Sequence, residues 1–184
     1  MATLKQKSIN GMIWTVGERL SMQLVQLVIS IVLARLLNPT VFGLISMLSI
    51  FTAIAQSILD SGFGSALIQK NNVDIKDTSS VFFFNLFIGI FLASVLYFSA
   101  PLIAKFYNQS ILIPITRVMS LNLIINSFSL VQTAMLTKEL DFKTQLKVGL
   151  ASSVASGAIG IILAYSGFGI WSLVIQHLAS ISYF

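Results

Sequence analysis

Charged residues and cysteine are what this sequence has least of. Only 9% of its 184 residues are charged and none is cysteine. Soluble domains carry about a quarter charged residues, so this chain has too few to cover a water-facing surface. The missing cysteines exclude disulfides and thiolate metal sites, and one histidine, His177, leaves no cluster for zinc. Apolar residues make up 56% of the chain and the mean hydropathy is +0.91, which predicts an integral membrane protein.

The apolar runs predict an all-α, polytopic membrane fold, a bundle of five complete transmembrane helices plus a partial sixth. A spanning helix needs about 20 apolar residues. The complete spans are expected at about 14–37, 42–59, 81–100, 112–136 and 148–165. The last run, 170–184, would rise only about 22 Å, which is less than the hydrocarbon core of about 30 Å. We therefore expect the sequence to end in the middle of a helix.

Two proline residues predict where the first and third spans end. Pro39 is expected to stop the first span and Pro101 to close the third, because proline disfavours helix in the residue before it. Few residues separate the first two spans, which predicts a tight antiparallel hairpin. The first apolar run is too long for the core of a signal peptide, so an uncleaved helix is expected.

The distribution of lysine and arginine predicts a cytoplasmic N-terminus. Basic residues near span ends favour the cytoplasmic side. Seven would lie on the side of the N-terminus: Lys5, Lys7, Lys70, Lys76, Lys138, Lys143 and Lys147. Only Arg35 and Lys105 would lie opposite, which places the polar stretch 69–80 and the stretch 138–147 in the cytoplasm. This scatter of charge over span ends also argues against a nucleic-acid partner.

Three of the expected spans carry polar side chains at helical spacing, which places them on one face of each helix. In the first span these are Arg19, Gln23, Gln26 and Ser30; in the second Ser46, Ser49, Ala53, Gln56 and Asp60; in the fourth Asn122, Asn126, Ser129 and Thr133. One interpretation is that they join neighbouring helices by hydrogen bonds. Three continuous polar faces favour a shared hydrated cavity instead. The fifth span has a face of small residues, including Gly157 and Gly160, which lets helices approach closely.

Two arginines lie inside expected spans. An arginine at mid-membrane costs about 2.5–3.5 kcal/mol on insertion scales, so Arg117 needs water, a partner or a path to the headgroups. Arg19 adjoins Glu18 and can reach the cytoplasmic headgroups. The candidates for a substrate cavity are therefore Arg117, Arg19, Gln23, Gln26, Gln56, Asn122 and Asn126. For His177 the default expectation is packing, and for Asp60 it is a solvated helix end.

No catalytic motif is present. Gly62-Phe63-Gly64 lacks the strand–turn–helix context of a phosphate loop, and no nucleophile–base pair can be identified. The sequence therefore predicts neither an enzyme nor a bound cofactor.

Three motifs resemble those of bacterial polysaccharide flippases. Ala34-Arg35-Leu36-Leu37-Asn38-Pro39 followed by Phe42-Gly43-Leu44 resembles the segment that joins their first two helices. The stretch from Asp60 to Gln69 is similar to their next motif, and Leu140-Asp141-Phe142-Lys143 to the one after the fourth helix. The similarity is to the lipopolysaccharide and colanic-acid type exporters of the multidrug/oligosaccharidyl-lipid/polysaccharide superfamily, over all 184 residues.

The resemblance implies two helical bundles around a cationic cavity in the bacterial inner membrane. Residues 1–184 would be the N-terminal bundle, and the second bundle would be absent. The implied substrate is an undecaprenyl-diphosphate-linked oligosaccharide, moved in some members by a proton or sodium gradient. Partners would be this lipid-linked oligosaccharide, membrane lipids and the missing C-terminal bundle. One alternative is a multidrug or peptidoglycan-precursor exporter of the same superfamily. A multidrug exporter would be expected to have acidic residues in its spans. The other alternative is a non-transporting membrane subunit or a truncated fragment.

Overall fold

The computed structural model of the chain describes residues 4–59, 75–138 and 142–181. Helices occupy nearly all of these residues: α1 (Leu4–Leu36), α2 (Pro39–Leu59), α4 (Ile75–Phe106), α5 (Leu112–Lys138), α6 (Phe142–Tyr165) and α7 (Ile170–Ile181). The predicted all-α class is confirmed. Asp60, the motif that follows it and the glycines at 62 and 64 lie outside the described residues.

Four of the described helices are long and apolar enough to cross a membrane. Their candidate spans are Pro39–Leu59, Thr78–Phe106, Leu112–Leu130 and Leu146–Tyr165. The apolar parts of α1 and α7 are shorter, Leu20–Leu36 and Ile170–Ser180. The chain is therefore a multi-pass membrane protein. The first expected span, 14–37, differs most from the structure. α1 already begins at Leu4, but its apolar part within the described residues starts only at Leu20.

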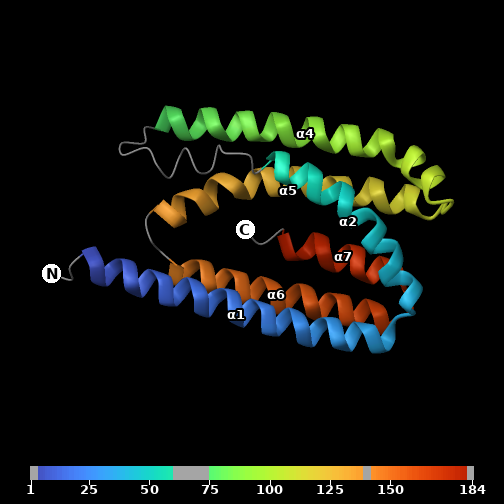
Figure 1. Ribbon diagram of the computed structural model, residues 1–184, viewed down its shortest axis with the longest axis horizontal. Helices are drawn as coiled ribbons and strands as arrows, with labels where there is room; N and C mark the ends of the chain where they lie inside the picture. The colour runs from blue at the N-terminus through green and yellow to red at the C-terminus, as the bar shows by residue number, and fades with distance from the viewer. Residues whose placement is uncertain (1–3, 60–74, 139–141, 182–184) are drawn as a thin grey trace.

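The helices form two layers (Figure 1). In one layer α4 packs along α5 and α2 lies against both; in the other α1 packs along α6 and α6 along α7, while α5 joins the layers through contacts with α7 and α6. The starts of α1, α4 and α6 lie at one end of the bundle, and the links from α1 to α2, α4 to α5 and α6 to α7 lie at the other. This alternation is what successive crossings of a bilayer require.

Small residues set the closest approaches between helices. A Cβ added to Gly157 of α6 would overlap Ile29 Cδ1 of α1, and one added to Gly160 would lie 2.9 Å from Gln176 Cβ of α7. Between α4 and α5, a Cβ on Gly89 would lie 2.7 Å from both Cβ and Oγ of Ser127. Helices in lipid associate mainly through such tight packing. The expected small-residue face of the fifth span is confirmed.

The predicted hairpin of the first two spans is wrong. Only Leu37 and Asn38 separate α1 from α2, yet the two helices diverge from this link and make almost no close contact (Figure 1). Each helix has another partner, α6 for α1, and α5 with α4 for α2. Polar side chains face the space between them, as described below, and such a space is not closed by dry packing.

Pro101 does not close the third span, contrary to expectation. It lies inside α4, which continues to Phe106. Proline removes one backbone hydrogen bond from a helix, but a helix in a membrane tolerates this because neighbouring groups satisfy the freed carbonyl. α4 begins at Ile75, so residues 75–80 of the expected polar stretch 69–80 are helical. Pro39 is the first residue of α2, a position where its missing N–H costs nothing.

The C-terminal ends of α4 and α6 have the same turn geometry. The N–H of Gln109 donates to Ala104 O at 2.9 Å, and the N–H of Phe168 donates to Leu163 O at 3.1 Å. Between each pair lies a residue with positive φ, Asn108 at 53° and Gly167 at 81°. This is the Schellman arrangement, which satisfies the last carbonyls of a helix. In each turn, two of the last carbonyls of the helix therefore accept hydrogen bonds from backbone N–H groups of the turn.

Candidate functional site

A polar chamber lies where α1 and α2 diverge. It has a volume of about 310 Å³, is lined by α1, α2, α5 and α7, and is open on one side, where Gln26, Ser30, Ser49 and His177 are exposed. Its lining residues are Gln26, Ser30, Leu33, Phe42, Ile45, Ser49, Thr52, Met119, Leu173, Gln176, His177 and Ser180. Seven of these twelve carry a polar side chain, in a chain that is 56% hydrophobic. Gln26 and Ser30 of the first predicted polar face and Ser49 of the second line this space, whereas α5 contributes Met119. A hydrated cavity shared by all three faces stays a prediction.

The hydroxyl oxygens of the chamber can still accept hydrogen bonds. Ser49 Oγ donates to Ser46 O at 2.7 Å, Ser30 Oγ to Leu27 O at 2.9 Å, and Ser180 Oγ to His177 O at 2.8 Å. Each hydroxyl hydrogen is thus used within its own helix. A hydroxyl oxygen has two acceptor lone pairs, so these oxygens can still accept hydrogen bonds from an occupant of the chamber.

A second hollow of about 620 Å³ adjoins the chamber on the face of α1. It is lined by Met22, Gln23, Gln26, Leu27 and Ser30 with Ser153 of α6. Gln26 and Ser30 line both spaces. The predicted face of the first span is thus a continuous polar edge shared by two cavities, and it brings Gln23 and Gln26 together as expected.

The other predicted carboxamides join α2 to α5. Asn126 Nδ2 donates to Gln56 Oε1 at 2.6 Å. Asn122, one helical turn from Asn126, is buried, and its Oδ1 has no partner within the described part of the chain. Gln56 and Asn126 therefore link α2 to α5, because their side-chain amides are hydrogen-bonded to each other.

Arg117 lies apart from the chamber. It is separated from Asn126 by nine positions of α5, which at about 3.6 residues per turn places the two on opposite faces. Its guanidinium carbon lies 4.8 Å from the ring centroid of Tyr97 on α4. A cation over an aromatic ring gains about 0.5–2 kcal/mol. The structure therefore groups Arg117 with α4, and its role as a cavity cation stays a prediction. Arg19 lies in α1, but its side chain is outside what the structure describes.

The contribution of α7 was missed by the sequence reasoning. Leu173, Gln176, His177 and Ser180 recur every three or four positions, so one face of α7 lines the chamber. Gln176 and His177 were assigned no such role, and His177 was expected to pack. The helical spacing of these residues can be read from the sequence. It indicates a cavity only once α1 and α2 are known to form the opposite wall.

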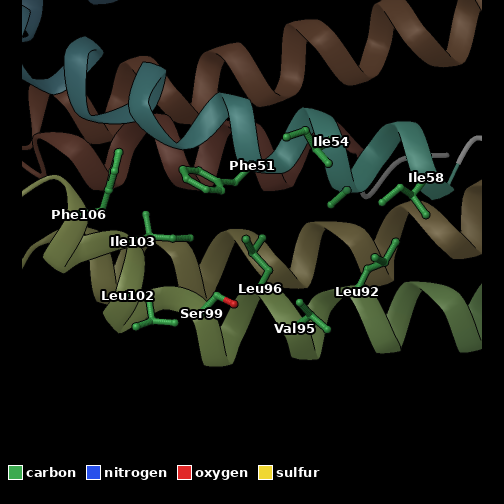
Figure 2. Close-up of a pocket in the computed structure, with 11 residues that line it drawn as sticks. Phe51, Ile54, Ile58, Leu92, Val95, Leu96, Ser99, Leu102, Ile103 and Phe106 are labelled. Atoms are coloured by element: carbon green, nitrogen blue, oxygen red, sulfur yellow. The ribbon is translucent and has the colours of Figure 1, made fainter.

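An apolar groove runs along the outside of α2 and α4. It has a volume of about 580 Å³, and Figure 2 shows side chains from both helices lining it, among them Phe51 and Ile58 of α2 and Leu92 and Phe106 of α4. Ser99 is the only labelled lining residue with a side-chain oxygen. Such a surface can contact hydrocarbon and offers almost no polar recognition.

Comparison with known proteins identifies a family and several relatives. Residues 32–184 match the family model described as polysaccharide biosynthesis protein. The teichuronic acid biosynthesis protein TuaB of Bacillus subtilis (strain 168) is 30% identical over 85% of this chain. The succinoglycan biosynthesis transport protein ExoT of Rhizobium meliloti (strain 1021) is 28% identical over 81%. The lipopolysaccharide biosynthesis protein WzxC of Escherichia coli (strain K12) is 25% identical over 83%.

These relatives are longer than the chain. The matched regions span 32%, 30% and 30% of TuaB, ExoT and WzxC, respectively. No solved structure matches the chain significantly. The resemblance drawn from the three motifs is confirmed by the family model and by these relatives.

Proposed function

This chain belongs to the polysaccharide biosynthesis protein family, and from that membership we propose that it forms the N-terminal bundle of a flippase. Its substrate is an undecaprenyl-diphosphate-linked oligosaccharide, carried across the bacterial inner membrane for surface or extracellular polysaccharide. The matched relatives are named for the biosynthesis of such polymers, and one of them for transport. The structural observation that carries the proposal is the polar chamber lined by α1, α2, α5 and α7.

The chemistry of the chamber suits a glycan. Gln26, Gln176 and the hydroxyls of Ser49 and Thr52 supply uncharged donors and acceptors. Sugar hydroxyls need hydrogen-bond partners of this kind on a path through hydrocarbon, where an unpaired polar group costs several kcal/mol. The partners of the chain are accordingly the lipid-linked oligosaccharide, membrane lipids and a second helical bundle. No catalytic group or bound cofactor is needed for this role.

The multidrug alternative is less well supported. Such an exporter would be expected to place acidic residues in its spans to bind organic cations. The chamber lining contains no aspartate or glutamate among the residues that the structure describes. Its amides and hydroxyls therefore favour a sugar over a cationic drug.

Deleting the gene tests the proposal. The expected result is loss of the mature polysaccharide together with accumulation of lipid-linked oligosaccharide on the cytoplasmic leaflet, and re-expression should reverse both. The leaflet is assayed by the access of an impermeant glycan reagent to intact and to permeabilised cells. If the oligosaccharide reaches the outer leaflet normally without the protein, the chain is a subunit of another process and not a flippase.

We further propose that the N-terminus is cytoplasmic. The ends of the described helices support this, because α1, α4 and α6 begin at the same end of the bundle, near most of the lysines (Figure 1). Without native cysteines, single cysteines can be placed at exposed positions outside the candidate spans near the two ends, Gln132→Cys and Gln109→Cys. An impermeant maleimide added to intact cells should label only Gln109→Cys. The opposite labelling pattern would reverse the orientation.

A further inference from the structure

Arg117 lies on the outside of the bundle. Asn126 marks the face of α5 that meets α2, and Arg117 lies on the opposite face of the helix. Three exposed apolar residues share the side of Arg117, because they lie three, four and eleven positions away from it: Pro114, Leu121 and Phe128. In a bilayer an exposed apolar stripe of this kind faces lipid. The positive charge of Arg117 therefore meets the membrane and not the chamber.

The backbone of Arg117 lies within the hydrocarbon region. The candidate span of α5 starts at Leu112, and five residues at 1.5 Å each place Arg117 about 8 Å beyond this start. The hydrocarbon core is about 30 Å thick, so Arg117 lies within the half of the core next to the turn that joins α4 to α5. A charge at this depth is costly unless water, a counter-charge or the headgroups can be reached.

Tyr97 of α4 holds the guanidinium at this surface. The Arg117 guanidinium carbon lies 4.8 Å from the centroid of the Tyr97 ring, and Tyr97 is itself exposed. The Nε of Arg117 is buried and has no hydrogen-bond partner in the described part of the chain. A guanidinium is a planar fork of N–H donors that matches the oxygens of a phosphate with two parallel hydrogen bonds. The ring thus positions a phosphate-binding group at the lipid surface.

The helices themselves offer no counter-charge for Arg117. No aspartate or glutamate occurs at positions 19–59, 78–138 or 142–184. Asp77 lies in the first turn of α4, at the other end of the bundle (Figure 1). At the end where α4 joins α5, the last turn of α4 instead adds a second cation, the exposed Lys105. The counter-anion of this surface must therefore come from outside the bundle.

We propose that Arg117 binds the phosphate of an anionic membrane phospholipid, in the leaflet at the end of the bundle where α4 joins α5. The guanidinium donates hydrogen bonds to the phosphate oxygens, the Tyr97 ring holds it in place, and Lys105 attracts the anionic headgroup. The acyl chains lie against the exposed stripe of α5. A diphosphate on the proposed substrate has similar chemistry, but Arg117 faces away from the chamber. The inference does not depend on the proposed function, because lipid binding is measured without transport.

Lipid binding by the purified chain tests this site. The chain is mixed in detergent with phosphatidylglycerol, and the bound lipids are counted by native mass spectrometry. Arg117→Gln should lower the affinity for phosphatidylglycerol several-fold. Arg35→Gln is the matched control, because it removes the same charge from an exposed residue in the last turn of α1, at the same end of the bundle. This control should bind phosphatidylglycerol like the natural chain.

Two further variants test how the guanidinium is used. Tyr97→Leu keeps every charge but removes the ring, so it should also weaken binding of phosphatidylglycerol. Arg117→Lys keeps the charge without the planar fork and should bind with intermediate affinity. Circular dichroism checks that all variants remain helical. Unchanged binding by Arg117→Gln, or equal losses in Arg117→Gln and Arg35→Gln, would overturn the site. Displacement of phosphatidylglycerol by an equal amount of undecaprenyl diphosphate would assign Arg117 to the substrate and contradict the proposal.

Discussion

Ser49→Trp is expected to reduce polysaccharide export to the level of cells that lack the protein, while the chain still reaches the membrane. Ser49 lines the chamber of about 310 Å³, and its hydroxyl donates only to Ser46 O in its own helix at 2.7 Å. The substitution therefore breaks no link between helices. A tryptophan side chain buries about 150–250 Å² of surface and would fill much of the space between α1 and α2. Export is measured as surface polysaccharide per unit of membrane-inserted protein.

Ser94→Trp is the matched control. Ser94 is an exposed residue of α4, and its hydroxyl makes the same kind of bond, to Ile90 O at 2.8 Å. It does not line the chamber. An indole there should rest against lipid and leave export normal. Equal loss of export in both variants would show that added bulk, not the chamber, is responsible.

Gly89→Leu should have the largest effect on the fold. Even a Cβ at this position would lie 2.7 Å from Ser127 Cβ and 3.2 Å from the backbone oxygen of Leu123. Neither atom is the end of a flexible side chain, so α4 and α5 must move apart. Overpacking of this kind costs about 1–3 kcal/mol, and α4–α5 is the most extensive helix contact among the described residues. The expected readouts are lower thermal stability in detergent and lower abundance in the membrane.

Gly43→Leu provides the comparison. Gly43 lies in α2, and a Cβ there would meet nothing within 4 Å. Glycine in a helix interior is about 0.8–1.0 kcal/mol less favourable than alanine in soluble hosts, and leucine ranks just below alanine. This variant should therefore be at least as stable as the natural chain. If the two variants are equally unstable, close packing at Gly89 does not hold α4 to α5.

Periodicity made much of the fold predictable. The apolar runs located α2, α5 and α6 within a few residues, because a bilayer demands long apolar helices. The spacing of Gln23, Gln26 and Ser30 correctly predicted one polar face on α1, since side-chain direction in a helix follows from position alone. The small residues of the fifth span likewise predicted close contact, now found at Gly157 and Gly160.

The pairing of helices could not be predicted in the same way. Short distance in sequence suggested a hairpin of α1 and α2, but α6 and α5 supply better partners. Pro101 was expected to end a helix, as proline does in soluble proteins, whereas α4 continues through it to Phe106. Arg117 was a cavity candidate together with Asn122 and Asn126, although it lies on the face of α5 opposite Asn126, over Tyr97 of α4. His177 could be assigned to the chamber only once the opposite wall was known.

The division into two layers also sets the order in which the chain assembles during synthesis. α1 ends at Leu36, whereas its packing partner α6 begins only at Phe142. More than a hundred residues must be translated between these points, which takes about 5–20 s at about 5–20 residues per second. Throughout that interval Ile29 lacks the surface of Gly157 against which it finally rests. The first helix to leave the ribosome is therefore among the last to find its neighbour.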